Sequence, residues 1–143
     1  MFGMLNNSFD TGSSGFCTMG QVTSGTTPAE LRIDGPTNSV PFKITNGYAY
    51  RIELTVVTSN YTPFGAQDVK EWKGFGLIKN NGTTALVGTF TMTSTYGDVA
   101  LAASTVVVTA DAVNDTLDIT VTGCTGLDQK WVATLQYEKI ALS

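Results

Sequence analysis

The fold of this chain is decided by its C-terminal third, which reads Thr105-Val-Val-Val-Thr-Ala110, then Thr116-Leu-Asp-Ile-Thr-Val-Thr122, then Trp131-Val-Ala-Thr-Leu-Gln-Tyr137. In the second run, apolar Leu117, Ile119 and Val121 alternate with polar residues, which is the period of a β-strand with one face in water. The third run alternates in the same way. The links between the runs are rich in Gly, Asn and Asp, so the three runs predict an antiparallel meander.

The chain upstream also reads as strands. The clearest strand covers residues 50–57, where every second residue is apolar and is expected to face inward. A second alternating run, residues 30–34, predicts one strand that stops at Gly35-Pro36. The only plausible helical turn is the short apolar connector at residues 99–103.

The count of such runs is about eight or nine, and sheet-on-sheet packing is the way to bury so many one-sided strands. We therefore predict an all-β fold, an antiparallel jelly-roll-like β-sandwich. A length of 143 residues fits one domain. The expected organisation is a flexible N-terminal anchor segment at residues 1–14, followed by a single β-sandwich domain at residues 15–143.

Composition excludes several classes of partner. Charged residues make up 14% of the chain, and 8 Lys and Arg stand against 12 Asp and Glu, giving a net charge of −4 without a basic cluster. A surface that follows phosphates is absent, so no nucleic acid is expected as a partner. No run approaches the roughly 18 apolar residues that span a bilayer, so no membrane is expected either.

The two cysteines, Cys17 and Cys124, lie far apart in the sequence. The N-terminus lacks the charged and apolar regions of a secretory signal, so we expect two reduced, mostly buried thiols and a protein made in a cytoplasm. A disulfide would require the fold to bring the two Cα atoms within about 7 Å.

The inventory of catalytic groups is thin. The chain has no His, no paired Cys at C-x-x-C spacing, no G-x-S-x-G motif and no P-loop. This predicts a protein that is not an enzyme and that holds no cofactor and no metal. Asp111, Asp115 and Asp118 lie close together in the sequence, and Asp98 and Asp128 lie in expected loops. Aspartates in turns usually cap the local backbone, so this interpretation is preferred to a glycosidase pair or a calcium site.

Two segments have both a structural and a functional interpretation. The N-terminal tip, with the apolar side chains Met1, Phe2, Met4 and Leu5, is either a frayed end or a docking peptide. The loop at residues 58–68 is the longest, and its aromatic side chains either cap the end of the sandwich or bind a ligand.

Several motifs follow one another in a distinctive order along the chain. They are Pro28-Ala-Glu-Leu-Arg-Ile-Asp-Gly35, Ile44-Thr-Asn-Gly-Tyr-Ala-Tyr-Arg-Ile-Glu-Leu-Thr-Val-Val57, Lys73-Gly-Phe-Gly-Leu-Ile-Lys79, Thr84-Ala-Leu-Val-Gly88, Val106-Val-Val-Thr-Ala-Asp111, Leu117-Asp-Ile-Thr-Val-Thr-Gly123 and Lys130-Trp-Val-Ala-Thr-Leu135. Their order resembles a β-rich domain of tailed-phage virion proteins, over about residues 15–140. The resemblance implies a jelly-roll-like head domain, usually trimeric, found at the ends of tail fibres and spikes and on other virion surfaces, without catalytic residues to transfer.

Fibre proteins of that kind place a long stalk before the head, whereas about fourteen residues precede this domain. The leading hypothesis is therefore a non-enzymatic homotrimer on the virion surface that decorates and cements the capsid, assembled in the host cytoplasm. Its partners are then itself and the major capsid protein or another virion protein, with anchoring through Met1, Phe2, Met4 and Leu5.

The alternative is a receptor-binding tip of a tail fibre or spike. It predicts that Tyr61, Phe64 and Tyr96 contact a host surface glycan or protein, because aromatic rings stack well on sugars. A third hypothesis, a carbohydrate hydrolase that uses two aspartates among Asp98, Asp111 and Asp128, has the least support.

Overall fold

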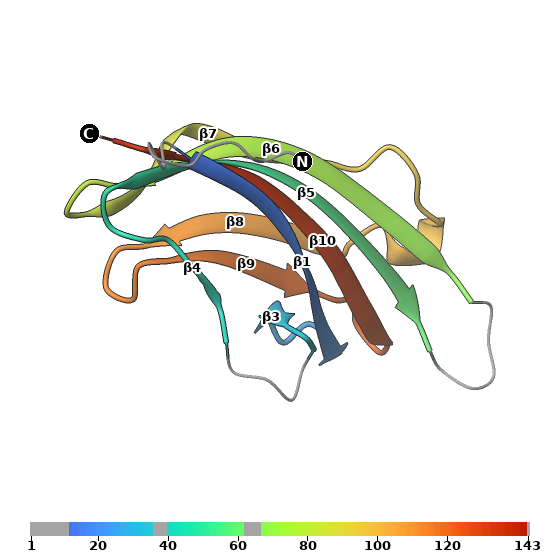
Figure 1. Ribbon diagram of the computed structural model, residues 1–143. Helices are drawn as coiled ribbons and strands as arrows, with labels where there is room; N and C mark the ends of the chain where they lie inside the picture. Colours follow the sequence, from blue (N-terminus) through green and yellow to red (C-terminus); the bar gives the residue numbers. More distant parts are fainter. Residues whose placement is uncertain (1–11, 36–39, 62–66, 143) are drawn as a thin grey trace.

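Two antiparallel sheets face each other in the computed structural model, a long curved sheet arching over a smaller one (Figure 1). The structure describes residues 12–35, 40–61 and 67–142. Each long strand buries alternate side chains, as the period-2 pattern requires. The core therefore lies between the concave face of the large sheet and the small sheet.

The large sheet has the strand order β3-β1-β10-β5-β6-β7. All of its pairs are antiparallel, and the longest ladders join β10 to both β1 and β5. Its strands are β1 (Gly12–Ser24), β3 (Arg32–Ile33), β5 (Tyr48–Asn60), β6 (Val69–Asn80), β7 (Thr84–Thr93) and β10 (Asp128–Ala141).

The small sheet is built around β9. Strand β8 pairs with one edge of β9, and the two-residue strands β2 and β4 pair with it at successive positions. A single 3-10 turn, η1 (Val99–Leu101), leads from β7 into β8, as expected for the apolar connector. The strands of this sheet are β2 (Ala29–Glu30), β4 (Phe42–Lys43), β8 (Thr105–Asp111) and β9 (Thr116–Thr122).

The predicted fold class is confirmed at the level of an all-β antiparallel sandwich, with ten strands in the described part of the chain. The inward faces are also as expected, since the residues predicted to face inward are buried; they are Tyr50, Ile52, Leu54 and Val56 of β5 and Leu117, Ile119 and Val121 of β9. The jelly-roll arrangement and the homotrimer are not shown by these sheets and stay predictions.

The meander predicted for the C-terminal third is wrong in its last step. β8 and β9 form the expected hairpin, but β10 pairs with β1 and β5 in the other sheet. A Gly-rich link with Gly126 at φ +75° carries the chain across the sandwich. Alternation cannot distinguish the two outcomes, because a strand has the same one-sided pattern in either sheet.

The single strand predicted for residues 30–34 is also divided. Its first part lies in β2, which pairs with β9, and its second part lies in β3, which pairs with β1. Leu31 stands at the crossing point and is buried between the sheets. The alternation in this run therefore marks a chain that passes from one layer to the other.

Two tryptophans form the centre of the core beneath the large sheet. The rings of Trp72 on β6 and Trp131 on β10 stack with their centroids 5.6 Å apart and an interplanar angle of 27°. The indole Nε1 of Trp131 donates to Thr23 Oγ1 at 2.8 Å, so this buried polar atom is satisfied. This packing joins β6 to β10 across β5, which lies between them in the large sheet.

Candidate functional site

Two of the three aromatic residues predicted for the receptor-binding alternative, Tyr61 and Tyr96, lie near the end of the large sheet where β5 ends and β6 begins. Tyr96 lies in the loop between β7 and η1 and is 73% exposed, while Tyr61 directly follows β5 and is 37% exposed. The third of these residues, Phe64, and the predicted anchor residues Met1, Phe2, Met4 and Leu5 lie outside the described residues.

A hollow of about 490 Å³ opens beside Tyr96, within the size range of ligand pockets. Exposed valines of β5 and β6 form its apolar part, and two carboxylates border it. We call it the Tyr96 hollow; it is lined by Val57, Val69, Lys70, Glu71, Tyr96, Gly97 and Asp98.

The loop that bears Tyr96 is fastened to the beginning of β6 by two reciprocal pairs of hydrogen bonds. The amide of Glu71 donates to the Tyr96 carbonyl (3.0 Å), and the Tyr96 amide donates to Glu71 Oε1 (3.3 Å). The amide of Asp98 donates to the Val69 carbonyl (2.9 Å), and the Val69 amide donates to Asp98 Oδ2 (2.9 Å). The backbone of the loop is thus fixed although the ring is open to solvent.

Lys70 supports the same region from below. Its ammonium group donates to the carbonyls of Leu101, Ala102 and Ser104 at 3.0 to 3.3 Å, and lies 4.9 Å from the ring centroid of Trp72. Its stem fills the space beside Gly97, where an added Cβ would come within 2.7 Å of Lys70 Cγ. Core, strand and loop are therefore connected through one side chain.

Glu71 has a spare acceptor. Its Oε1 accepts the amides of Thr95 (3.4 Å) and Tyr96 (3.3 Å), whereas its Oε2 is buried without a hydrogen-bond partner among the described residues. A buried carboxylate oxygen that accepts nothing is rare and costly. The hollow thus combines an exposed tyrosine, apolar side chains and the exposed carboxylate of Asp98, which are groups that bind sugar rings and their hydroxyls.

Tyr61 is not among the lining residues of the Tyr96 hollow. Its amide donates to the Asp128 carbonyl (3.1 Å), and the ammonium of Lys130 lies 5.1 Å from its ring centroid. The sequence analysis places Tyr61 and Tyr96 in one candidate group, whereas in the structure the two tyrosines have different surroundings. Tyr61 therefore does not contribute to the Tyr96 hollow.

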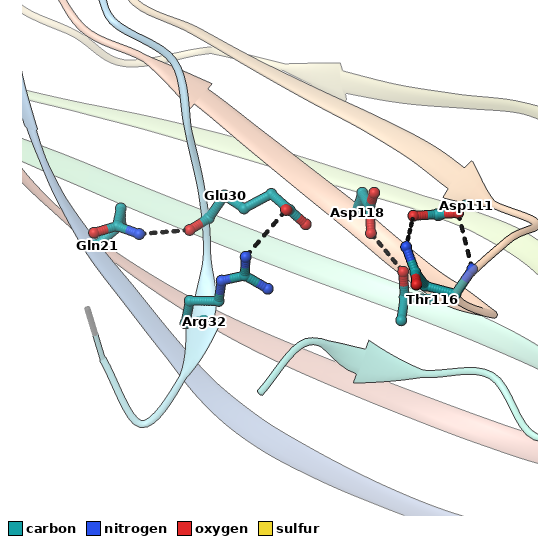
Figure 2. A network of polar contacts seen from close by, with 7 residues as sticks. Gln21, Glu30, Arg32, Asp111, Thr116 and Asp118 are labelled. Carbon is teal, nitrogen blue, oxygen red and sulfur yellow. Dashed lines mark hydrogen bonds and ion pairs between the residues drawn. The ribbon is translucent and has the colours of Figure 1, made fainter. Parts of the chain in front are cut away.

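A second concentration of polar side chains lies on the outer face of the small sheet (Figure 2). It surrounds a hollow of about 500 Å³, which we call the Glu30 hollow. Glu30 extends from β2 toward Asp118 on β9, and Arg32 pairs with Glu30 at 3.2 Å. The lining residues are Glu30, Arg32, Val40, Pro41, Lys43, Asp111, Asn114, Thr116 and Asp118.

Two carboxyl groups of the Glu30 hollow have pKa values that are shifted in opposite directions. The pKa of Glu30 is raised, chiefly by burial and then by the neighbouring charge of Asp118, while Arg32 acts against the rise. The pKa of Asp111 is lowered, because it accepts hydrogen bonds from the Asn114 side chain and from the amides of Asn114 and Val113. Asp111 therefore caps its turn, as predicted, and Glu30 is a candidate acid that the sequence analysis missed.

The described residues provide no other recognisable centre. They contain no group of three or more side chains that could hold a metal ion. Within the same ranges there is no helix with the length and apolar character needed to cross a membrane. Cys17 and Cys124 are both free thiols, the first half-buried and the second buried.

Comparison with known protein families and with curated proteins finds no match. Among solved structures, the chain is similar to the tailspike gp49 of Acinetobacter baumannii bacteriophage Fri1, described as a capsular polysaccharide depolymerase, with 10% identity and a TM-score of 0.48 over 93% of this chain. It is also similar to the tailspike of Acinetobacter baumannii phage AM24, with 10% identity and a TM-score of 0.40 over 85% of this chain. The tailspike of Acinetobacter phage vB_ApiP_P1 is similar with 10% identity and a TM-score of 0.33 over 94% of this chain.

The chain spans 19%, 26% and 22% of those three tailspikes, respectively, so each similarity covers only a fragment of the larger protein. At 10% identity the likeness concerns the course of the backbone alone. Tailspikes correspond to the receptor-binding alternative of the sequence analysis. Nothing in the comparisons supports the leading hypothesis of capsid decoration or a capsid partner.

The prediction that the protein is not an enzyme is overturned by the same finding, because the Fri1 tailspike is described as a depolymerase, which is an enzyme. The physical reason for the error lies in the argument from missing residues. Cleavage of a glycosidic bond needs two carboxyl groups and no histidine. The absence of His therefore excludes less chemistry than the composition suggests.

Proposed function

We propose that this domain belongs to a tail-associated protein of a phage virion and recognises a glycan on the host surface through the Tyr96 hollow. The resemblance of its sequence to phage virion domains supports the setting. The geometry of the Tyr96 hollow supports the recognition of a glycan. The domain would then be one recognition unit of a tail spike or fibre.

One observation carries this proposal: Tyr96 is 73% exposed while its backbone is held by Glu71 at both the amide and the carbonyl. Because the loop backbone is already ordered, binding a ligand on this tyrosine costs little backbone conformational entropy. The apolar face of a sugar ring can stack on the tyrosine while its hydroxyls donate to the exposed carboxylate of Asp98. Val57 and Val69 supply apolar contact beneath it.

Binding to host cells tests the proposal. Labelled protein is expected to coat encapsulated host cells and to leave cells stripped of surface polysaccharide unstained. Tyr96→Ala is expected to weaken binding to the purified polysaccharide about tenfold, through loss of stacking. Tyr61→Ala is the matched control, since this exposed tyrosine lies at the same end of the sheet but outside the hollow. Equal losses in both variants would contradict the proposal.

A second candidate function is cleavage of a glycosidic bond in the Glu30 hollow. The observation that favours it is the pairing of β2 with β9, which brings Glu30 and Asp118 to the lining of one hollow, where burial raises the pKa of Glu30; glycosidases use two neighbouring carboxyl groups. Release of reducing ends from host polysaccharide is the assay. Glu30→Gln and Asp118→Asn are each expected to abolish it, and unchanged release in either variant would refute this role.

We also propose that the chain assembles as a homotrimer, as head domains of the resembling kind do. Symmetric assembly would cover exposed edges of the two sheets. Light scattering is expected to give three times the chain mass of 15.1 kDa. A monomer at micromolar concentration would refute the trimer without affecting the sugar-binding proposal.

A further inference from the structure

Two phenylalanines stand out on the convex face of the large sheet. Phe16 on β1 is 74% exposed and Phe75 on β6 is 65% exposed. Both point away from the core, and neither belongs to the Tyr96 hollow or the Glu30 hollow. Exposed aromatic rings of this size on rigid strands call for an explanation, because they cost solubility.

The strand register places these rings in one row across the sheet. Phe16 is the partner of Gln136, Gln136 of Glu53, Glu53 of Phe75, and Phe75 of Thr91. Residues in such a row share one face of the sheet. The two rings are separated by three strand spacings, or about 14 Å. This distance exceeds the size of a single sugar ring.

Two hollows occupy the row and meet at Glu53. The first, of about 310 Å³, is lined by residues that include Phe16, Arg51 and Gln136. The second, of about 550 Å³, is lined by residues that include Phe75 and a set of threonines, namely Thr55, Thr89, Thr91 and Thr93. An aromatic ring therefore borders each hollow, and Glu53 borders both.

Charged side chains of both signs pair with one another between the rings. Arg51 donates to Glu53 Oε2 at 2.6 Å and lies 4.0 Å from Glu138, and its guanidinium carbon lies 5.4 Å from the ring centroid of Phe75. Arg51 and Lys73 stand against Glu53 and Glu138 in the lining of the two hollows, so neither sign of charge dominates. The lining of the two hollows therefore offers the amide of Gln136, the carboxylate of Glu53 and the guanidinium of Arg51, together with threonine hydroxyls.

We propose that this row, the Phe16–Phe75 track, is a second binding site, which takes an extended, neutral glycan chain with one sugar unit stacked on each phenylalanine. Fixed donors and acceptors between two aromatic platforms suit a ligand that offers hydroxyls along its whole length. Balanced charge suits an uncharged chain. The track shares no lining residue with the Tyr96 hollow and does not depend on the proposed function.

A second copy of the chain fits this face less well. The centre of a protein–protein interface is depleted of charged residues, whereas the centre of the track holds Arg51, Glu53, Lys73 and Glu138. Nucleic acid fits less well too, because the track has no excess of positive charge. The observations therefore favour the glycan.

Affinity electrophoresis of the full chain through gels that contain a neutral polysaccharide tests the proposal. Dextran, mannan, a mixed-linkage β-glucan and a galactan serve as probes. At least one is expected to retard the protein, and Phe16→Ala and Phe75→Ala are each expected to weaken that retardation about tenfold. With oligosaccharides of the active polymer, affinity is expected to rise steeply with chain length, and either variant should flatten this dependence, since one chain no longer contacts both rings.

Val132→Ala is the matched control, because Val132 is 55% exposed on the same face but lies outside the row. Thermal unfolding of all variants is expected to match the parent, as the replaced side chains are exposed. The proposal is overturned if no probe retards the protein, or if Tyr96→Ala removes retardation that the phenylalanine variants leave intact. It is equally overturned if Phe16→Ala or Phe75→Ala converts an oligomer to a monomer, which would show that copies of the chain cover this face.

Discussion

The carboxylate of Glu71 accepts the backbone amide of Tyr96 at 3.3 Å, and the Glu71 amide donates to the Tyr96 carbonyl at 3.0 Å. A residue of strand β6 thus holds both the backbone amide and the backbone carbonyl of the candidate sugar-binding tyrosine. The relationship links the rigidity of β6 to the presentation of an exposed ring. Four predictions test this and other contacts.

Replacing Glu71 separates the loop from the strand. Glu71→Ala is expected to lower the free energy of unfolding by about 2 kcal/mol, because two amides lose a charged acceptor. It is also expected to raise hydrogen exchange at Thr95 and Tyr96 and to weaken glycan binding. Glu71→Gln retains an acceptor at Oε1 and is the control for the loop. Unchanged exchange in Glu71→Ala would contradict the assignment.

Gln129 on β10 connects this strand to β5 and to the link that crosses the sandwich. Its Oε1 accepts the Cys124 amide (2.7 Å), its Nε2 donates to Thr58 Oγ1 (3.0 Å), and its side chain is fully buried. Gln129→Ala leaves these partners unsatisfied in a cavity, so a loss of about 3 kcal/mol is expected in chemical denaturation. Thr134→Ala, at an exposed position of β10, is expected to change stability by less than about 0.5 kcal/mol.

Gly74 allows β6 and β7 to lie close together. A Cβ at this position would clash with the carbonyl oxygen of Thr91 and the sulfur of Met92. Gly74→Ala is therefore expected to destabilise the protein by about 1 to 3 kcal/mol, because a backbone group has to move. Gly20→Ala is the comparison, since its Cβ would meet neighbours at 3.4 Å, an ordinary contact. Similar melting temperatures for both variants would show that the sheet adapts freely.

The raised pKa of Glu30 predicts a dependence of stability on pH. A carboxyl group whose folded-state pKa lies above its ordinary value of 4.5 binds its proton more tightly in the folded protein. The resulting stabilisation is complete below the ordinary pKa and is lost as the pH rises through the raised pKa. Glu30→Gln cannot titrate, so its melting temperature is expected to rise relative to the parent between about pH 4 and about pH 6.

Loss of the ion pair with Arg32 shifts the melting temperature of Glu30→Gln by a similar amount at every pH in this interval. The pKa of Glu30 is therefore reported by the way in which the difference in melting temperature between variant and parent changes with pH. Parallel curves for parent and variant across this interval would refute the shift. Asp111 does not confuse the result, because its pKa is lowered and the stability it adds is lost only at more acid pH.

Local pattern predicted the individual strands well and their partners less well. Alternation in β5 and β9 correctly identified the buried faces, because the side-chain period is a property of the strand itself. It could not show that β10 joins β1 and β5, or that the chain changes sheet at Leu31. Those outcomes depend on contacts between distant segments.

The candidate sites differ in the same way. Tyr96 could be found as an exposed aromatic residue of a loop, but the hollow beside it exists only because β6 pairs with that loop. Glu30 and Asp118 meet through the pairing of β2 with β9, and Phe16 and Phe75 align through four strands. No spacing in the sequence encodes these juxtapositions.

The position of β10 between β1 and β5 has a consequence for the newborn chain. Ribosomes release β1 and β5 well before β10, and Gly12 finds its partner only when Ile140 has been made. Until then both strands expose unpaired edges and apolar faces, the condition in which nascent β-proteins aggregate or recruit chaperones. A stop codon placed before residue 128 should therefore yield an insoluble product, whereas translation through β10 supplies the strand that joins β1 to β5.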